Sequence, residues 1–169
     1  MRLSSSRVSE MVHEMVAALT AGGDIECEDP KEVARDLESV LNQYIQDEAD
    51  ITDRARDMIA TRGLPQSDIG KTRRLLADQR KIKIDDDAID YLLDQLLEML
   101  MHSNNVEEIF AEDYQLRKKM REPLRKQADL DAELQQAVRN QLKHVKEGTS
   151  TWEIEYRRVM EDIKRRKGL

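Results

Sequence analysis

A repeated pattern of apolar positions constrains the fold of this chain more than any other feature of its sequence. A shift of 81 residues places the apolar positions of the first segment on apolar positions of the second half. Leu3, Val8, Met11, Val12, Met15, Val16, Leu19 and Ile25 fall on Ile84, Ile89, Leu92, Leu93, Leu96, Leu97, Leu100 and Val106. At an offset of 79, Leu37, Leu41, Ile45, Ile51 and Ile59 fall on Leu116, Met120, Leu124, Leu130 and Val138. An internal repeat of this kind indicates a duplicated structural unit.

The repeat divides the chain into two predicted units. Residues 1–82 form the first helical unit, and residues 83–169 form the second, which carries an additional C-terminal helix. The repeated positions are apolar positions of the kind that form a core. Reactive residues are not repeated, and His13, for example, corresponds to Asp94 in the second unit. The pattern leaves open whether the two units share one core or form two lobes.

The composition favours helices. Charged residues make up 37% of the chain and aromatic residues 4%, and the sequence lacks the β-branched and aromatic clusters that strands require. An apolar share of 39%, arranged with helical spacing, argues against disorder. We therefore predict an all-α fold of tandem duplicated units with long amphipathic helices.

Capping residues predict where the first helix of each unit begins and ends. Ser4 is a good N-cap, and Gly22–Gly23 are typical of a helix end. In the second unit Asp85 takes the capping position, and the helix end falls at 103–105. Different residues thus repeat the same local logic.

The second helix has the clearest start signal in the chain. Asp29 can cap it, Pro30 occupies the first position, where its missing N–H costs nothing, and Glu32 completes a capping box. Its apolar stripe extends to Arg62. Asp47 and Glu48 interrupt the stripe, so the pattern does not decide whether the helix breaks near Asp50.

Three further helices are expected. A short helix is predicted over about 68–80. The counterpart of the long helix is predicted over about Val106–Val145, with a kink or split at Pro123, because proline removes a backbone donor. The last helix is predicted to have Ser150 as its cap and to be anchored by Trp152, the only tryptophan.

Cysteine content and hydropathy favour a cytoplasmic location. A single cysteine, Cys27, cannot form an intrachain disulfide, and the N-terminal residues lack the apolar run of a signal peptide. The longest strongly apolar stretch, Leu96 to Met101, is too short to span a bilayer. We expect a soluble cytoplasmic protein without membrane association.

Several segments resemble a known family. These are the opening Met-Arg-Leu-Ser-Ser-Ser-Arg-Val-Ser, the acidic Asp50-Ile51 after a long helix, and the tail from Glu147 through Trp152 to Arg166. They resemble a bacterial family of small helical proteins of unknown function, DUF507, across essentially the whole chain. The resemblance implies a bacterial cytoplasmic protein, and it supplies no activity and no functional residues.

Candidate metal and catalytic motifs have simpler explanations. Glu10 and His13 have the spacing of a di-metal ligand pair, but no second copy of the motif exists, so His13 is interpreted as a boundary residue. Asp24, Glu26 and Glu28 alternate like a calcium loop without its glycine and final glutamate. We interpret this stretch as an acidic loop before a helix, and Asp85–Asp87 as first-turn charges.

The sequence offers no further reactive group. Acidic neighbours are expected to raise the pKa of the Cys27 thiol, which opposes nucleophilic reactivity. Neither a P-loop nor a dinucleotide fingerprint is present. We therefore expect no catalytic, cofactor-binding or metal residues and a protein that is not an enzyme.

Three basic stretches lie in the second half of the chain, namely Lys71 to Lys83, Arg117 to Lys126 and Arg157 to Lys167, and the first two are the best functional lead in the sequence. The cations are Lys71, Arg73, Arg74, Arg80, Lys81 and Lys83 in the first stretch, and Arg117, Lys118, Lys119, Arg121, Arg125 and Lys126 in the second. Clustered cations of this kind can bind phosphate. Acidic residues are interleaved with them and no aromatic platform accompanies them, and solvated helix faces with ion pairs explain such stretches more often than phosphate binding does.

The leading hypothesis is a helical module for protein–protein interaction or assembly. Residues 1–60 contain 14 acidic against 6 basic residues, whereas residues 61–169 contain 21 against 22. This asymmetry permits head-to-tail self-association. The alternative is a nucleic-acid-associated protein that uses the basic stretches of the second half. The residues identify no partner and no oligomeric state.

Overall fold

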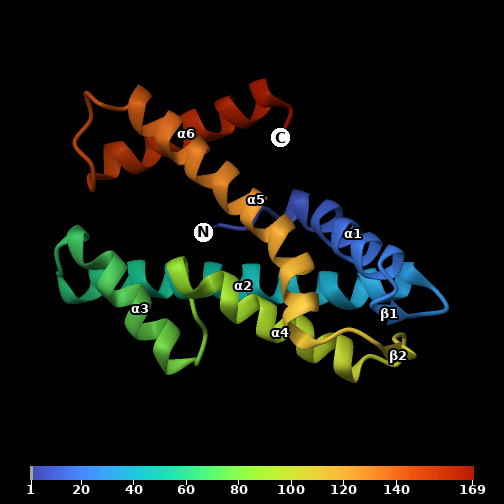
Figure 1. Cartoon of the computed structure of the whole chain (residues 1–169). Helices are drawn as coiled ribbons and strands as arrows, with labels where there is room; N and C mark the ends of the chain where they lie inside the picture. The colour runs from blue at the N-terminus through green and yellow to red at the C-terminus, as the bar shows by residue number, and fades with distance from the viewer. Residues whose placement is uncertain (1) are drawn as a thin grey trace.

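The computed structural model describes residues 2–169 and contains six α-helices and one small two-stranded sheet (Figure 1). Helices account for 77% of the structure, which confirms the all-α prediction. The α-helices are α1 (Ser5–Ala21), α2 (Pro30–Arg62), α3 (Ile69–Gln79), α4 (Ala88–His102), α5 (Asp113–Gln141) and α6 (Ser150–Lys167). The strands are β1 (Ile25–Glu26) and β2 (Glu108–Ile109), and short 3₁₀ turns cover Gln66–Asp68 and Asp85–Asp87.

Helices α1, α2, α4 and the first half of α5 form the main body. Helices α1 and α4 each pack against both long helices, α2 and α5. The strands join the loops after α1 and α4 in an antiparallel pair that places Ile25 beside Ile109. One hydrophobic cluster fills this body with side chains from both halves of the chain, including Met15, Leu37, Leu96 and Leu116.

Most of the apolar positions that match in the sequence are buried in both halves, and Ile45, Ile89, Val106 and Leu130 are half-buried. Met15 and Leu96 are fully buried, and so are Leu37 and Leu116. The burial pattern explains why these positions are apolar in each half, since each helix presents one stripe to the shared core. A common origin of the halves by duplication stays a prediction.

Both long helices are continuous through the positions where a break was expected. Helix α2 runs unbroken through Asp50, because Ile51 is fully buried and Glu48 has an ion-pair partner on α3. Helix α5 runs through Pro123, so the predicted split is wrong. Proline costs one backbone hydrogen bond there, and the buried neighbours Met120 and Leu124 hold the helix against the core.

The start of α5 was predicted seven residues too early. The segment from Val106 onward carries β2, whose backbone pairs with β1, and the helix begins only at Asp113. A capping box between Glu112 and Gln115 fixes that start. Helix signals alone could not reveal the strand, because its partner lies in the other half of the chain.

The remaining caps differ from the predictions in detail. Asp29 caps α2 as expected by accepting a hydrogen bond from the Lys31 N–H, whereas Glu32 bonds to Arg35 instead of completing a box. Thr149 and not Ser150 caps α6. Asp85 lies in a 3₁₀ turn before α4 and adopts a left-handed backbone with φ 56°, so it does not cap that helix.

The second half of α5 and helix α6 form a hairpin with a separate small core. Leu134, Val138, Leu142, Val159 and Ile163 make up this cluster, and Trp152 packs against it. Figure 1 shows the hairpin extending from one end of the main body, on the same side as α3 and away from the strands. No helix among residues 2–169 is long and apolar enough to cross a membrane.

Candidate functional site

Four of the six cations in the second basic stretch hold α5 to its neighbours. Arg117 and Arg121 form ion pairs with Asp94 and Asp90 on α4. Lys119 forms an ion pair with Asp24 in the loop after α1, and Lys126 forms one with Glu14 on α1. Arg125 and Lys118 are exposed. The stretch therefore lines a helix interface and presents little free positive charge.

The first basic stretch is divided between the surface and the interior. Lys71, Arg74 and Lys81 are exposed on or beside α3, and Lys83 lies 3.7 Å from Asp78. Arg73 points inward, with only 18% of its side chain exposed. The structure brings this one residue, of the twelve predicted, into a large cleft.

That cleft has a volume of about 610 Å³ and lies between the α5–α6 hairpin, α2 and the segment that precedes α1. Its lining contains seven cationic side chains, namely Arg2, Arg7, Arg56, Arg73, Arg139, Arg157 and Lys164. Four carboxylates also line it, namely Glu48, Asp85, Asp131 and Glu153. We call it the arginine cleft. Cations converge here from α1, α2, α3, α5 and α6, which no single stretch of sequence reveals.

Apolar side chains form one wall of the arginine cleft. Leu130 and Leu134 come from α5, and Trp152, Tyr156 and Met160 come from α6. The rings of Trp152 and Tyr156 lie 4.8 Å apart and tilted, as aromatic pairs prefer. Because Leu134 belongs to the hairpin core, the wall is continuous with a packed structure. It offers a ligand apolar contact close to positive charge.

An ion-pair network lies at the floor of the cleft. The Arg73 guanidinium donates to the Thr52 hydroxyl at 3.1 Å, to Glu48 at 3.3 Å and to Asp85 at 3.4 Å. Burial raises the pKa of the Glu48 carboxyl, and the Arg73 charge opposes that rise. Three partners thus use the donors of Arg73, which fits a structural role that joins α2 to α3 and to the turn before α4.

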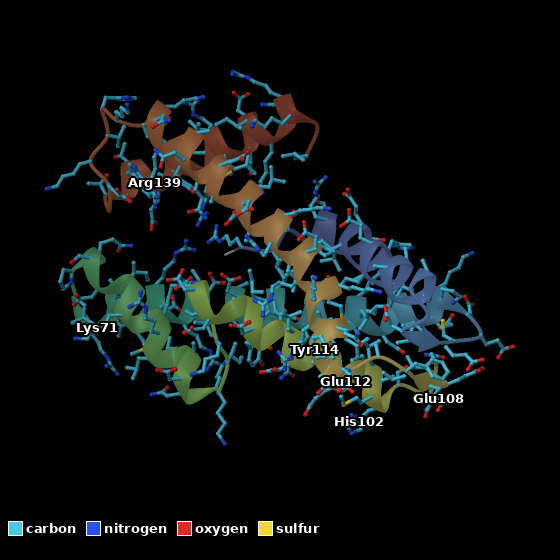
Figure 2. The ribbon with its side chains drawn as sticks, viewed as in Figure 1. Lys71, His102, Glu108, Glu112, Tyr114 and Arg139 are labelled. Carbon is cyan, nitrogen blue, oxygen red and sulfur yellow. The ribbon has the colours of Figure 1, made fainter. Side chains whose placement is uncertain are left out.

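Apart from Arg73, the cleft cations are either unpaired or paired near the surface, as Arg7 is with Glu10 and Arg56 with Asp53. Among the described residues, Arg157 and Lys164 form no ion pair, and neither does the side chain of Arg2. Arg139 lies 3.8 Å from Glu147, and the two side chains are 49% and 66% exposed, so solvent screens the pair. Figure 2 shows Arg139 on the hairpin, on the side of the molecule that carries α3. The mouth of the cleft therefore carries positive potential.

Comparison with protein families identifies the chain. A family described as "Protein of unknown function (DUF507)" matches residues 1–169. The chain belongs to the DUF507 family. The match covers the whole chain and confirms the resemblance in its opening and tail segments. A search of curated proteins finds no match.

Other candidate residues of this DUF507 chain lie outside the arginine cleft. His13 is exposed and bonds to the Ser9 carbonyl in its own helix. Burial raises the pKa of the Cys27 thiol, and Glu107 and Asp29 raise it further. The expected direction is thus found, although Glu107 comes from the other half of the chain. Among residues 2–169, no group of three or more His, Cys, Asp or Glu side chains is placed to hold a metal ion.

One sequence signal pointed to the arginine cleft. On α6, Tyr156, Arg157, Met160 and Lys164 recur at helical spacing and therefore share a face. A stripe that mixes cations with aromatic and apolar residues differs from an ordinary core stripe. Arg157 and Lys164 also belong to the third basic stretch, and their periodicity with Tyr156 and Met160 distinguishes this face.

Proposed function

We propose that this DUF507 protein is a non-enzymatic, cytoplasmic binding module whose arginine cleft takes an acidic segment of a partner protein. The observation that carries the proposal is the convergence of free cations beside an apolar wall. Arg157 and Lys164 supply positive charge, and the half-buried side chains of Leu130 and Met160 supply apolar surface in the same cleft. A segment that mixes carboxylates with one or two apolar side chains matches both features.

Several features favour a protein segment over nucleic acid. The cleft contains carboxylates, including Asp131 and Glu153, which would repel a run of phosphates. The exposed ring faces of Trp152 and Tyr156 are limited, because the two rings contact each other and both are half-buried. The α5 cations that could have tracked a nucleic-acid backbone are mostly engaged in ion pairs. Nucleic acid binding through α3 is therefore an outcome that the experiment must distinguish.

The single tryptophan provides a direct test. Trp152 lines the cleft, so a ligand that enters should change its fluorescence. The probe is a short synthetic peptide in which glutamates flank two leucines, and the comparison ligands are its lysine counterpart and an oligothymidine. We expect a saturable change with the acidic peptide alone, which weakens as salt is raised because screening reduces the attraction.

Adjacent arginines on α6 provide a matched pair of variants. Arg157→Glu reverses a cation that lines the cleft and should weaken peptide binding about tenfold or more, equivalent to about 1.4 kcal/mol. Arg158→Glu changes the next residue, which bonds to Glu155 outside the cleft, and should leave binding near the wild-type value. Equal effects of the two variants, or a response to oligothymidine and not to the peptide, would overturn the proposal.

A further inference from the structure

The end of the molecule opposite the arginine cleft is acidic. We call the two loops that carry the strands, residues 24–29 and 104–113, the strand pole. The strand pole contains eight acidic residues, namely Asp24, Glu26, Glu28, Asp29, Glu107, Glu108, Glu112 and Asp113, and it contains neither lysine nor arginine. Figure 2 shows Glu108 at one end of the molecule and Arg139 on the hairpin at the other.

Most carboxylates of the strand pole lack a counter-charge. Asp24 is buried and paired with Lys119. The other seven are exposed, and none forms an ion pair with any residue that the structure describes. The β1–β2 pair brings the two loops together, so charges from distant parts of the sequence add in one place. The strand pole therefore carries strong negative potential.

Two exposed aromatic side chains lie at the strand pole, one within it and one on the residue that directly follows it. Phe110, the only phenylalanine, is 62% exposed, and Tyr114 is 68% exposed. The Phe110 N–H donates to the Asp24 carbonyl at 2.8 Å, which holds the backbone of this loop against the loop after α1. Phe110 is thus an exposed aromatic side chain in a segment rich in carboxylates. Exposed aromatic side chains of this kind often anchor protein–protein interfaces.

The strand pole and the arginine cleft are complementary in charge and in apolar character. The cleft offers free cations beside an apolar wall, and the strand pole offers free carboxylates beside aromatic rings. Figure 1 places the strands and the α5–α6 hairpin at opposite ends, so the two surfaces cannot meet within one molecule. They can meet between two copies.

We propose that the arginine cleft of one copy receives the strand pole of a second copy. The inference rests on the proposed function, because it names the partner of that same cleft. In this arrangement Phe110 contacts the wall at the half-buried Leu130 and Trp152, and the glutamates face Arg139 and Arg157. The two surfaces differ, so the contact is head-to-tail and propagates as an open chain unless it closes into a ring.

Complementation between variants tests the arrangement. One variant, Arg157→Glu, disables the cleft and keeps the strand pole. The other combines Glu108→Gln with Phe110→Ser, which disables the strand pole and keeps the cleft. In analytical ultracentrifugation we expect wild-type mass to rise with concentration and to fall with added salt. Each variant alone should be monomeric, and an equimolar mixture should form a dimer that goes no further.

Controls separate this inference from the proposed function. Leu75→Ser removes another exposed apolar side chain, from α3 and outside the cleft lining, and should associate like wild type. A wild-type chain that stays monomeric, or a mixture that fails to dimerise, would overturn the self-association. If the acidic peptide still binds in that case, the cleft serves another protein and the proposed function stands. If the peptide fails to bind as well, both are wrong.

Discussion

Replacing Arg73 with methionine is expected to lower the free energy of unfolding by about 3–5 kcal/mol, as removal of one partner from a buried ion pair commonly does. The substitution keeps the apolar stem of the side chain and removes the guanidinium. Glu48, whose side chain is 8% exposed, then loses its counter-charge, and Thr52 loses a donor. Urea denaturation followed by circular dichroism measures the change.

A substitution of the neighbouring arginine and a double substitution provide the controls. Arg74→Met changes an exposed residue without an ion pair in the described chain and should cost less than about 0.5 kcal/mol. Glu48→Gln combined with Arg73→Met should recover much of the loss, because no buried charge is left unpaired. A double variant as unstable as Arg73→Met alone would show that packing, and not charge, causes the defect.

The raised pKa of Glu48 determines how the Arg73 defect varies with pH. A carboxyl whose pKa is higher in the folded state binds its proton more tightly there, so its contribution favours folding below the ordinary value of 4.5. That contribution declines as the pH rises from 4.5 toward the folded value. Loss of the Arg73 charge raises the folded pKa further. The loss of unfolding free energy caused by Arg73→Met should therefore be largest near neutral pH and smaller in acid.

Replacing Leu96 with alanine is expected to destabilise the main body by about 2–5 kcal/mol, since a fully buried leucine leaves a cavity. Leu96 lies on α4 and belongs to the cluster that both halves of the chain share. Circular dichroism, which is dominated by the long helices, should record the full shift in the urea midpoint.

Leu134→Ala is the matched substitution in the hairpin core. Because that core is a separate cluster, its loss should act first on the α5–α6 hairpin, which Trp152 fluorescence reports. We expect the fluorescence transition of Leu134→Ala to precede the transition seen by circular dichroism. Coincident transitions would contradict this and show that hairpin and main body unfold as one unit.

Local signals predicted the helices well where capping and periodicity act within a few residues. Helix α3 lies within the predicted 68–80, and Asp29 and Gly22 mark the ends of their helices as expected. The predicted helix starts and caps are wrong where a contact with a distant part of the chain determines the local structure. Residues 108–109 pair with β1, so α5 begins only at Asp113. Asp85 forms an ion pair with Arg73 and lies in a 3₁₀ turn, where it does not cap α4.

The candidate site could not be located from the sequence for a similar reason. Cation density selected Arg117 and Lys119, whose carboxylate partners lie on elements far away in the chain. The arginine cleft instead gathers isolated arginines, such as Arg56 and Arg139, that stand out in no local window. The cleft forms where separate helices converge in the tertiary fold. Only the cleft-lining face of α6 shows a periodic pattern in the sequence.

The most direct test of the arginine cleft is a ¹H–¹⁵N correlation spectrum of the Glu108→Gln, Phe110→Ser variant, which keeps the cleft and is expected to be monomeric, recorded during titration with the acidic peptide. Trp152 gives the single indole signal of the chain, so its assignment is immediate. We predict that this signal shifts together with backbone amides of residues 130–139 and 156–164, while amides of residues 104–113 stay in place. Shifts confined to α3 or to the strand pole, or a Trp152 signal that does not move at saturating peptide, would contradict the account.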